Sequence, residues 1–98
     1  MNEQFNIRLE AKNPEEGHLR AYRIDAGHDL FGQWSIEVNY GRIGRCGRSV
    51  TYSAADDAAA AAIVRNCLQR RATAPKRIGV PYQIRELCDP KEWAGVRV

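Results

Sequence analysis

The chain has 98 residues, enough for one domain with a single modest core and too few for two domains. Hydrophobic residues make up 44% of it and charged residues 28%, which excludes a disordered chain, and no apolar run approaches the roughly 18 residues of a membrane span. The net charge of +3 is concentrated, since residues 41–84 alone carry eight basic and two acidic residues, a balance that suits a polyanionic partner.

The N-terminal segment has an early acid and no apolar run, so it lacks the pattern of a signal peptide, and we expect a cytoplasmic location. Phe5, Ile7 and Leu9 then alternate with polar residues, which predicts a short strand at a sheet edge. After a charged loop, Leu19–Ala26 predicts a more central strand, because it has apolar residues on both faces. We expect Tyr22 in the core rather than on a binding surface.

The clearest strand is Gln33–Tyr40, in which Trp34 and two aliphatic residues alternate with polar ones and are expected in the core. Tyr40 has the same parity but ends the strand, so periodicity alone is compatible with burial and with stacking on a ligand. The preceding loop holds Leu30 and Phe31. Adjacent apolar side chains in a loop usually fold back over the end of a core, which we expect here, and the alternative is an exposed tip that binds a partner.

A cluster of glycines and arginines follows this strand. Glycines at three-residue spacing predict a hairpin near Gly44–Gly47, where the backbone needs unusual φ or close approach. Arginines are interleaved at the same spacing, so the hairpin should present cationic side chains with few neighbours to pair with. These arginines are Arg42, Arg45 and Arg48.

Residues 49–52 predict a short strand, and residues 54–71 predict the main helix. Ser53, followed three residues later by Asp56, is typical of a helix cap, and an apolar stripe at helical spacing follows an alanine run. Arg70 and Arg71 fall in the last turn of this helix, where they either offset the helix dipole or belong to a basic surface.

Lys76 and Arg77 open the last predicted strand, Ile78–Ile84, in which Gly79 and Pro81 indicate an irregular or edge strand. The expected fold is therefore of the α+β class, an antiparallel sheet of about four or five strands packed against one main helix. We expect one domain over residues 1–84 and a tail, residues 85–98, that packs on it.

The sequence offers little for catalysis or metal binding. Three cysteines form an odd count without Cys-x-x-Cys spacing, so we expect free thiols and no metal site. No phosphate-binding loop, zinc-protease motif or nucleophile elbow is present, and the glycine spacing does not fit a dinucleotide-binding fingerprint. We expect a non-enzymatic protein without a cofactor.

Residues 19–84 resemble the WGR domain, a small module of poly(ADP-ribose) polymerases and of bacterial proteins. The resemblance rests on the triplet Tyr40-Gly41-Arg42, where Tyr replaces the family's Trp, and on the flanking segments Asp29-Leu30-Phe31-Gly32-Gln33-Trp34 and Gly41-Arg42-Ile43-Gly44. It implies a nucleic-acid-binding module, in which the aromatic residue of the triplet stacks near a nucleic-acid end and the arginine makes polar contacts.

The charge and aromatic pattern predicts a nucleic-acid-binding surface that acts by charge and stacking. The resemblance favours recognition of nucleic-acid ends or breaks, and we expect DNA rather than RNA. The residues predicted to form this surface are Tyr40, Gly41, Arg42, Arg45, Arg48, Lys76 and Arg77. The competing hypothesis is a protein-interaction module without membrane contact. In that case the same arginines would dock an acidic partner and Leu30 and Phe31 would be its apolar anchor.

Overall fold

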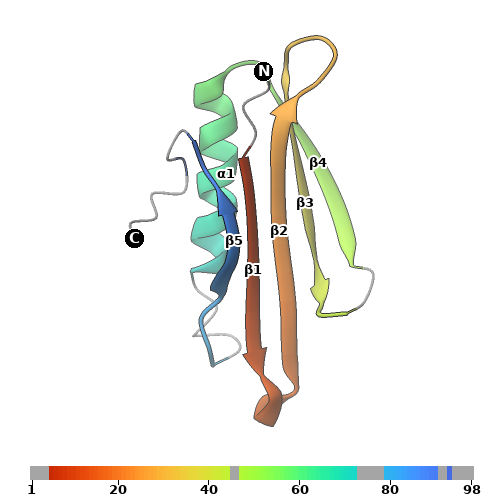
Figure 1. The fold of residues 1–98 in the computed structure, drawn as a ribbon, viewed down its shortest axis with the longest axis vertical. Coiled ribbons are helices and arrows are strands. Elements are labelled where there is room, and N and C mark those ends of the chain that lie inside the picture. Colours follow the sequence, from red (N-terminus) through yellow and green to blue (C-terminus); the bar gives the residue numbers. More distant parts are fainter. Residues whose placement is uncertain (1–4, 45–46, 73–78, 91–92, 94–98) are drawn as a thin grey trace.

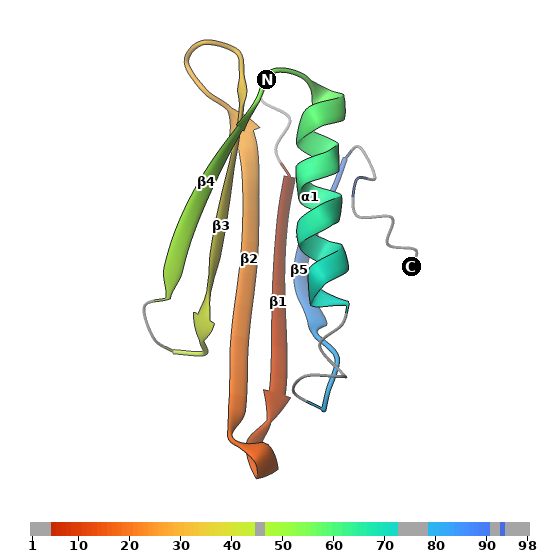
Figure 2. The ribbon, with the colours of Figure 1, turned by 180° about the vertical axis from the view of Figure 1, so that it is seen from behind.

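The computed structural model describes residues 5–44, 47–72, 79–90 and 93. Its elements are β1 (Phe5–Asn13), a 3-10 turn (Pro14–Glu16), β2 (His18–His28), β3 (Trp34–Arg42), β4 (Arg48–Ala54), α1 (Asp57–Arg71) and β5 (Gln83–Cys88). The strands form one antiparallel sheet in the order β4-β3-β2-β1-β5, and α1 packs on one of its faces (Figures 1 and 2). The predicted α+β fold is confirmed. None of the described helical segments has the length and apolar character needed to cross a membrane.

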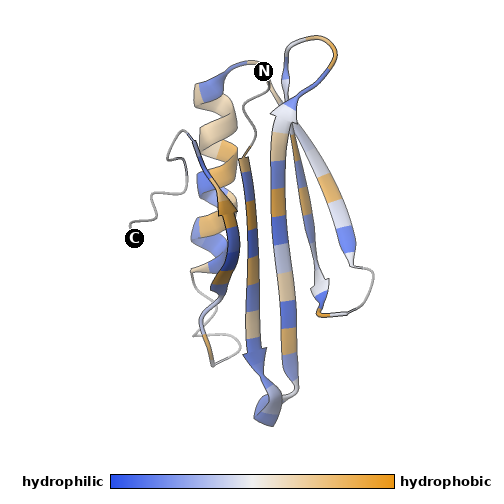
Figure 3. Ribbon diagram, viewed as in Figure 1, coloured by the Kyte–Doolittle hydropathy of each residue, from blue (hydrophilic) through white to orange (hydrophobic). Residues whose placement is uncertain are grey.

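Buried and more exposed residues alternate along β1, β2 and β3, which separates the two faces of the sheet, and the colour bands of β1 and β2 show this alternation in Figure 3. We call the face beneath α1 the helix-side face and the opposite one the open face. Trp34 and Tyr22 are buried on the helix-side face, with 2% and 4% of their surfaces exposed, as their sequence pattern predicts. The core continues into α1 through Ala60 and Val64, which are fully buried.

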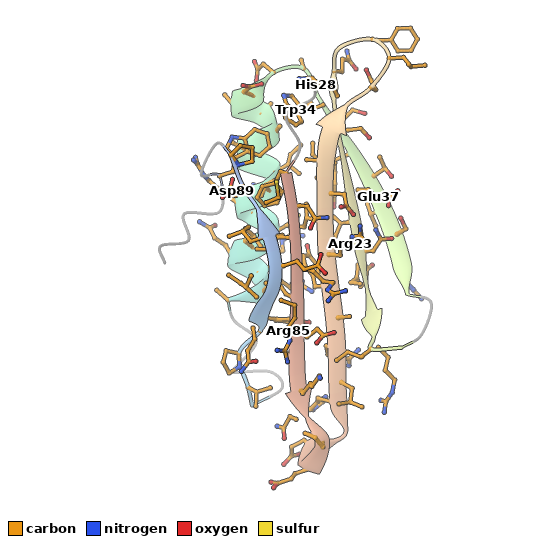
Figure 4. All side chains as sticks on the ribbon, in the orientation of Figure 1. Arg23, His28, Trp34, Glu37, Arg85 and Asp89 are labelled. Atoms are coloured by element: carbon orange, nitrogen blue, oxygen red, sulfur yellow. The ribbon has the colours of Figure 1, made fainter. Side chains whose placement is uncertain are left out.

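The prediction that β1 lies at an edge is wrong, because β1 pairs with β2 on one side and with β5 on the other. Its charged residues, which suggested an edge, pair with the neighbouring strand on the open face. Arg8 lies 3.3 Å from Glu86, and Arg85 lies 3.1 Å from Glu10. Figure 4 labels Arg85 among the side chains of this face.

The last strand lies later in the chain than the predicted Ile78–Ile84. Pro81 lacks a backbone N–H and Gly79 has a φ of 80°, so this stretch does not continue a regular ladder and the strand forms at Gln83–Cys88. Residues on both sides of position 84 therefore belong to β5. Beyond it, Trp93 is buried and stacks on Phe5, with the ring centroids 5.9 Å apart.

The helix begins three residues later than predicted, because β4 continues through Ser53 to the buried Ala54. Asp56 is the cap, and its carboxylate accepts a hydrogen bond of 2.8 Å from the N–H of Ala59. The next residue, Asp57, accepts a hydrogen bond of 2.7 Å from the indole Nε1 of Trp34. This bond joins the first turn of α1 to β3 and satisfies the polar atom of a buried tryptophan.

The β2–β3 loop contradicts the prediction that its apolar residues cover the core. Leu30 is 99% exposed and Phe31 is 89% exposed. Asp29 holds the loop, since its carboxylate accepts hydrogen bonds from the N–H groups of Phe31 and Gln33 at 2.8 and 3.0 Å. A backbone bond of 2.8 Å from Asp29 N–H to the carbonyl of Gln33 closes the loop base. The end of the core that these side chains were expected to cover is occupied by aromatic rings, including Trp93, whose ring centroid lies 4.8 Å from that of Trp34.

Candidate nucleic-acid interface

The β3–β4 hairpin lies at the end of the sheet opposite to the Leu30–Phe31 loop (Figures 1 and 2). Two glycines allow the backbones of β3 and β4 to approach each other closely beside the turn. A Cβ atom on Gly41 would come within 2.7 Å of the Cα of Gly47, and one on Gly47 would come within 2.0 Å of the carbonyl oxygen of Tyr40. The predicted need for close backbone approach is thus met by Gly41 and Gly47 together.

Strand register gathers cations on the helix-side face at this end. Arg42 lies opposite Arg20 of β2, and Tyr40 lies between Tyr22 of β2 and Arg48 of β4. Arg20, Arg42 and Arg48 are all exposed. We call the four residues Arg20, Tyr40, Arg42 and Arg48 the hairpin-end surface.

The pair Arg20 and Arg42 differs from a second pair of facing arginines, Arg8 and Arg23, on the open face. There each arginine has a carboxylate, since Arg8 pairs with Glu86 and Arg23 lies 2.8 Å from Asp25. Within residues 5–44, 47–72 and 79–90, no carboxylate pairs with Arg20, Arg42 or Arg48. Like charges that face each other across strands destabilise a sheet, so a bound anion between Arg20 and Arg42 would be stabilising. The Nη1 atom of Arg42 donates to the carbonyl oxygen of Gly17, in the turn between β1 and β2, at 3.4 Å.

Tyr40 is 37% exposed, and its ring is tilted against that of Tyr22 with the centroids 6.4 Å apart. One part of the ring therefore rests on the core and another part meets solvent. Periodicity alone is compatible with both burial and stacking, and the structure gives this side chain an environment that permits stacking on a ligand.

A groove opens beside Tyr40, between the hairpin strands and the last turns of α1. Figure 2 shows α1 over β1 and β5, with β3 and β4 diverging from it toward their turn. The groove has a volume of about 210 Å³, and Tyr22 and Cys67 lie at its inner side. Its other lining residues are Val38, Tyr40, Val50, Tyr52, Arg70 and Arg71.

The Arg71 side chain lies between α1 and the helix-side face of the sheet and does not point outward from the helix. Its guanidinium carbon lies 4.6 Å from the centre of the Tyr22 ring, a cation–π contact. Burial raises the pKa of the Tyr22 hydroxyl above its ordinary value of 10.0, and a hydrogen bond with Cys67 raises the pKa further. Arg71 acts in the opposite direction, because its positive charge favours the phenolate. Tyr22 therefore remains neutral across the physiological pH range.

Four of the residues predicted for the site lie together at this end of the sheet: Tyr40, Gly41, Arg42 and Arg48. Arg45, Lys76 and Arg77 lie outside the described residues. Sequence reasoning missed Arg20, although its parity in β2 matches that of Tyr22 and points to the helix-side face. Only the pairing register shows that it faces Arg42.

A family model, that of the WGR domain, matches residues 5–73. No curated protein matches the chain, and no solved structure does.

Proposed function

Because the chain belongs to the WGR domain family, whose members are nucleic-acid-binding modules, we propose that it binds DNA ends or breaks through the hairpin-end surface. The observation that carries this proposal is the pair Arg20 and Arg42, which face each other without a carboxylate among the described residues. A polyanion relieves the repulsion between them, so binding and local stability change together.

The chemistry of this surface suits the sugar–phosphate backbone. Arginine presents a planar fork that binds phosphate oxygens in pairs, and three arginines around one aromatic residue can follow consecutive phosphates. Such contacts position a duplex without reading its sequence. Tyr40 adds a ring face, which can stack only where a base or sugar is exposed, as at an end or a break.

Three further cations extend this surface in the proposal. Arg45 lies in the chain between Gly44 and Gly47 of the hairpin turn, and Lys76 and Arg77 follow α1. The protein acts without catalysis or a cofactor in this proposal, because binding accounts for the charge pattern and the sequence contains no phosphate-binding loop, zinc-protease motif or nucleophile elbow.

The test compares Arg48→Ala with a matched control, Arg85→Ala, whose guanidinium is held by Glu10 on the open face. Each protein is titrated with blunt, nicked and single-stranded DNA and with RNA at several salt concentrations. We expect Arg48→Ala to weaken binding to every probe similarly and to reduce the slope of log K against log salt by about 0.9 per lost phosphate contact. Arg85→Ala should match the wild type. Equal losses in both variants would show that the effect is one of net charge and not of this surface.

A second candidate function is protein binding, and the exposure of Leu30 and Phe31 favours it. Apolar side chains held this far into solvent by a hydrogen-bonded loop suit an apolar pocket on another protein. The loop and the arginines lie at opposite ends of β3, about 26 Å apart for eight residue steps. A single compact docking surface therefore does not contain both.

Photocrosslinking in cells tests this candidate. A photoreactive amino acid is placed at position 31, and the control carries it at position 51 on the open face. We expect position 31 alone to trap one particular protein. A Phe31→Ser variant should then lose that protein in a purified assay and keep its DNA affinity. A parallel loss of DNA affinity would assign the loop to nucleic-acid binding, and identical crosslinks from both positions would remove the candidate.

A further inference from the structure

Arg71 lies on the face of α1 that packs against the sheet, where the helical pattern predicts an apolar residue. The buried residues of the helix include Ala60, Val64 and Cys67, and the same stripe reaches position 71 one turn later. The Nε atom of Arg71 is buried and has no hydrogen-bond partner among the described residues. A buried donor without an acceptor is costly. Arg71 is also partly exposed and lines the groove beside Tyr40, so an acceptor bound in that groove can meet the guanidinium there.

The groove that Arg71 lines combines an apolar floor with aromatic walls. Val38 and Val50 face each other across β3 and β4, and Tyr40 and Tyr52 flank them with 37% and 38% of their surfaces exposed. None of the described lining residues is a carboxylate. A bare phosphate would leave the apolar floor uncovered, and an uncharged apolar ligand would leave the Arg71 donor without an acceptor. A flat ring that carries an attached anion satisfies both parts.

We propose that this groove takes up an unpaired nucleobase at the end of a DNA strand, with the adjoining phosphate or base oxygens accepting from Arg71. The inference rests on the proposed function, because Tyr40 belongs to both the groove and the hairpin-end surface. A strand whose phosphates lie along Arg42 and Arg48 can place its terminal base beside Tyr40. The groove then distinguishes ends with an overhang from blunt ends.

The test uses Tyr52→Ala, which changes the groove without changing the hairpin-end surface, and Tyr52→Phe as its matched control. Affinities are measured for a blunt duplex and for the same duplex with a one-nucleotide 5′ or 3′ overhang carrying 2-aminopurine. We expect Tyr52→Ala to lose about tenfold in affinity for an overhang, the size of one stacking contact, and to bind the blunt duplex as the wild type does. Tyr52→Phe keeps the ring and should keep both affinities.

The fluorescence of 2-aminopurine gives a second readout, because stacking quenches it. Quenching should occur with wild type and Tyr52→Phe and should be lost with Tyr52→Ala. Arg71→Met, which keeps a long aliphatic side chain, should also weaken overhang binding selectively. Equal losses for blunt and overhang probes, or no loss in a folded Tyr52→Ala protein, would overturn the groove while leaving nucleic-acid binding intact. The proposed function itself fails separately, if Arg48→Ala binds the blunt duplex unchanged.

Discussion

Arg20 and Arg42 face each other across β2 and β3, on the side of the sheet that carries α1. Within the described part of the chain neither is paired with a carboxylate, whereas Arg8 and Arg23, the facing pair on the open face, are each neutralised. The two pairs of facing arginines therefore differ in whether carboxylates lie beside them. The open-face pair is held by carboxylates, whereas at the hairpin end Arg42 donates to the backbone carbonyl of Gly17 at 3.4 Å.

Replacing Arg20 should therefore separate stability from binding. Arg20→Thr removes one member of a like-charged pair and inserts a residue suited to a strand, so we expect the free energy of unfolding to rise by roughly 0.2–1 kcal/mol. DNA affinity should fall, with a smaller salt dependence. Denaturant unfolding and DNA titration of the same preparation measure both. Arg23→Thr is the control, and it should gain no stability and keep DNA affinity, because it breaks an ion pair with Asp25.

Tyr40 should contribute to the recognition of ends rather than to general affinity. We expect Tyr40→Ala to lose affinity chiefly for ends, nicks and single strands, by roughly 1–3 kcal/mol, while the salt slope stays nearly unchanged. Tyr40→Phe keeps the ring and should behave as the wild type. The measurement is competition between a closed circular duplex and a linear one. A uniform loss on both substrates would show that Tyr40 supports the hairpin rather than stacks on DNA.

The close approach of Gly41 and Gly47 should make the hairpin intolerant of a single methyl group. A Cβ atom at either position meets backbone and not a flexible side chain, so Gly47→Ala should destabilise the fold by roughly 1–3 kcal/mol and weaken DNA binding by displacing Arg48. Gly32→Ala is a matched control at the other end of the sheet. The Cβ atom added at Gly32 meets no atom within 4 Å, but alanine at a φ of 80° lowers the free energy of unfolding by roughly 1–2 kcal/mol. Stability should fall in both variants, and DNA affinity only in the first.

The raised pKa of Tyr22 predicts a loss of stability in alkali. The unfolded chain releases this proton near the ordinary pKa of 10.0, whereas burial holds it in the folded protein to higher pH. The stabilising contribution is therefore complete below about pH 10 and falls above it, by at most about 1.4 kcal/mol for each pH unit. Tyr22→Phe cannot ionise, so its free energy of unfolding should decline less steeply between about pH 9 and pH 11. Parallel curves for both proteins would contradict this assignment.

The sequence by itself determined the first four strands, the helix and the resemblance to a family, whereas the last strand was predicted at Ile78–Ile84 and forms at Gln83–Cys88. Alternation in β1 and β3 and the alanine-rich stripe of α1 are local patterns, and a strand or helix forms from such patterns wherever one face can be buried. The Tyr40-Gly41-Arg42 triplet lies at the end of β3, so its position beside the hairpin could also be predicted. Boundaries were less certain, because a cap at Ser53 and one at Asp56 look alike until the length of β4 is known.

The tertiary structure alone decided which side chains meet. Arg20 and Arg42 are 22 positions apart, and only the pairing register of β2 and β3 sets them face to face. Arg71 was predicted only as a cation in the last turn of the helix, and the packing of α1 on the sheet places its guanidinium over the ring of Tyr22. The general tendency of apolar side chains to be buried predicted that Leu30 and Phe31 cover the core. They are exposed instead, because the Asp29 carboxylate holds their loop away from the core. Burial and pairing depend on the whole packed molecule, and no local window of sequence contains that information.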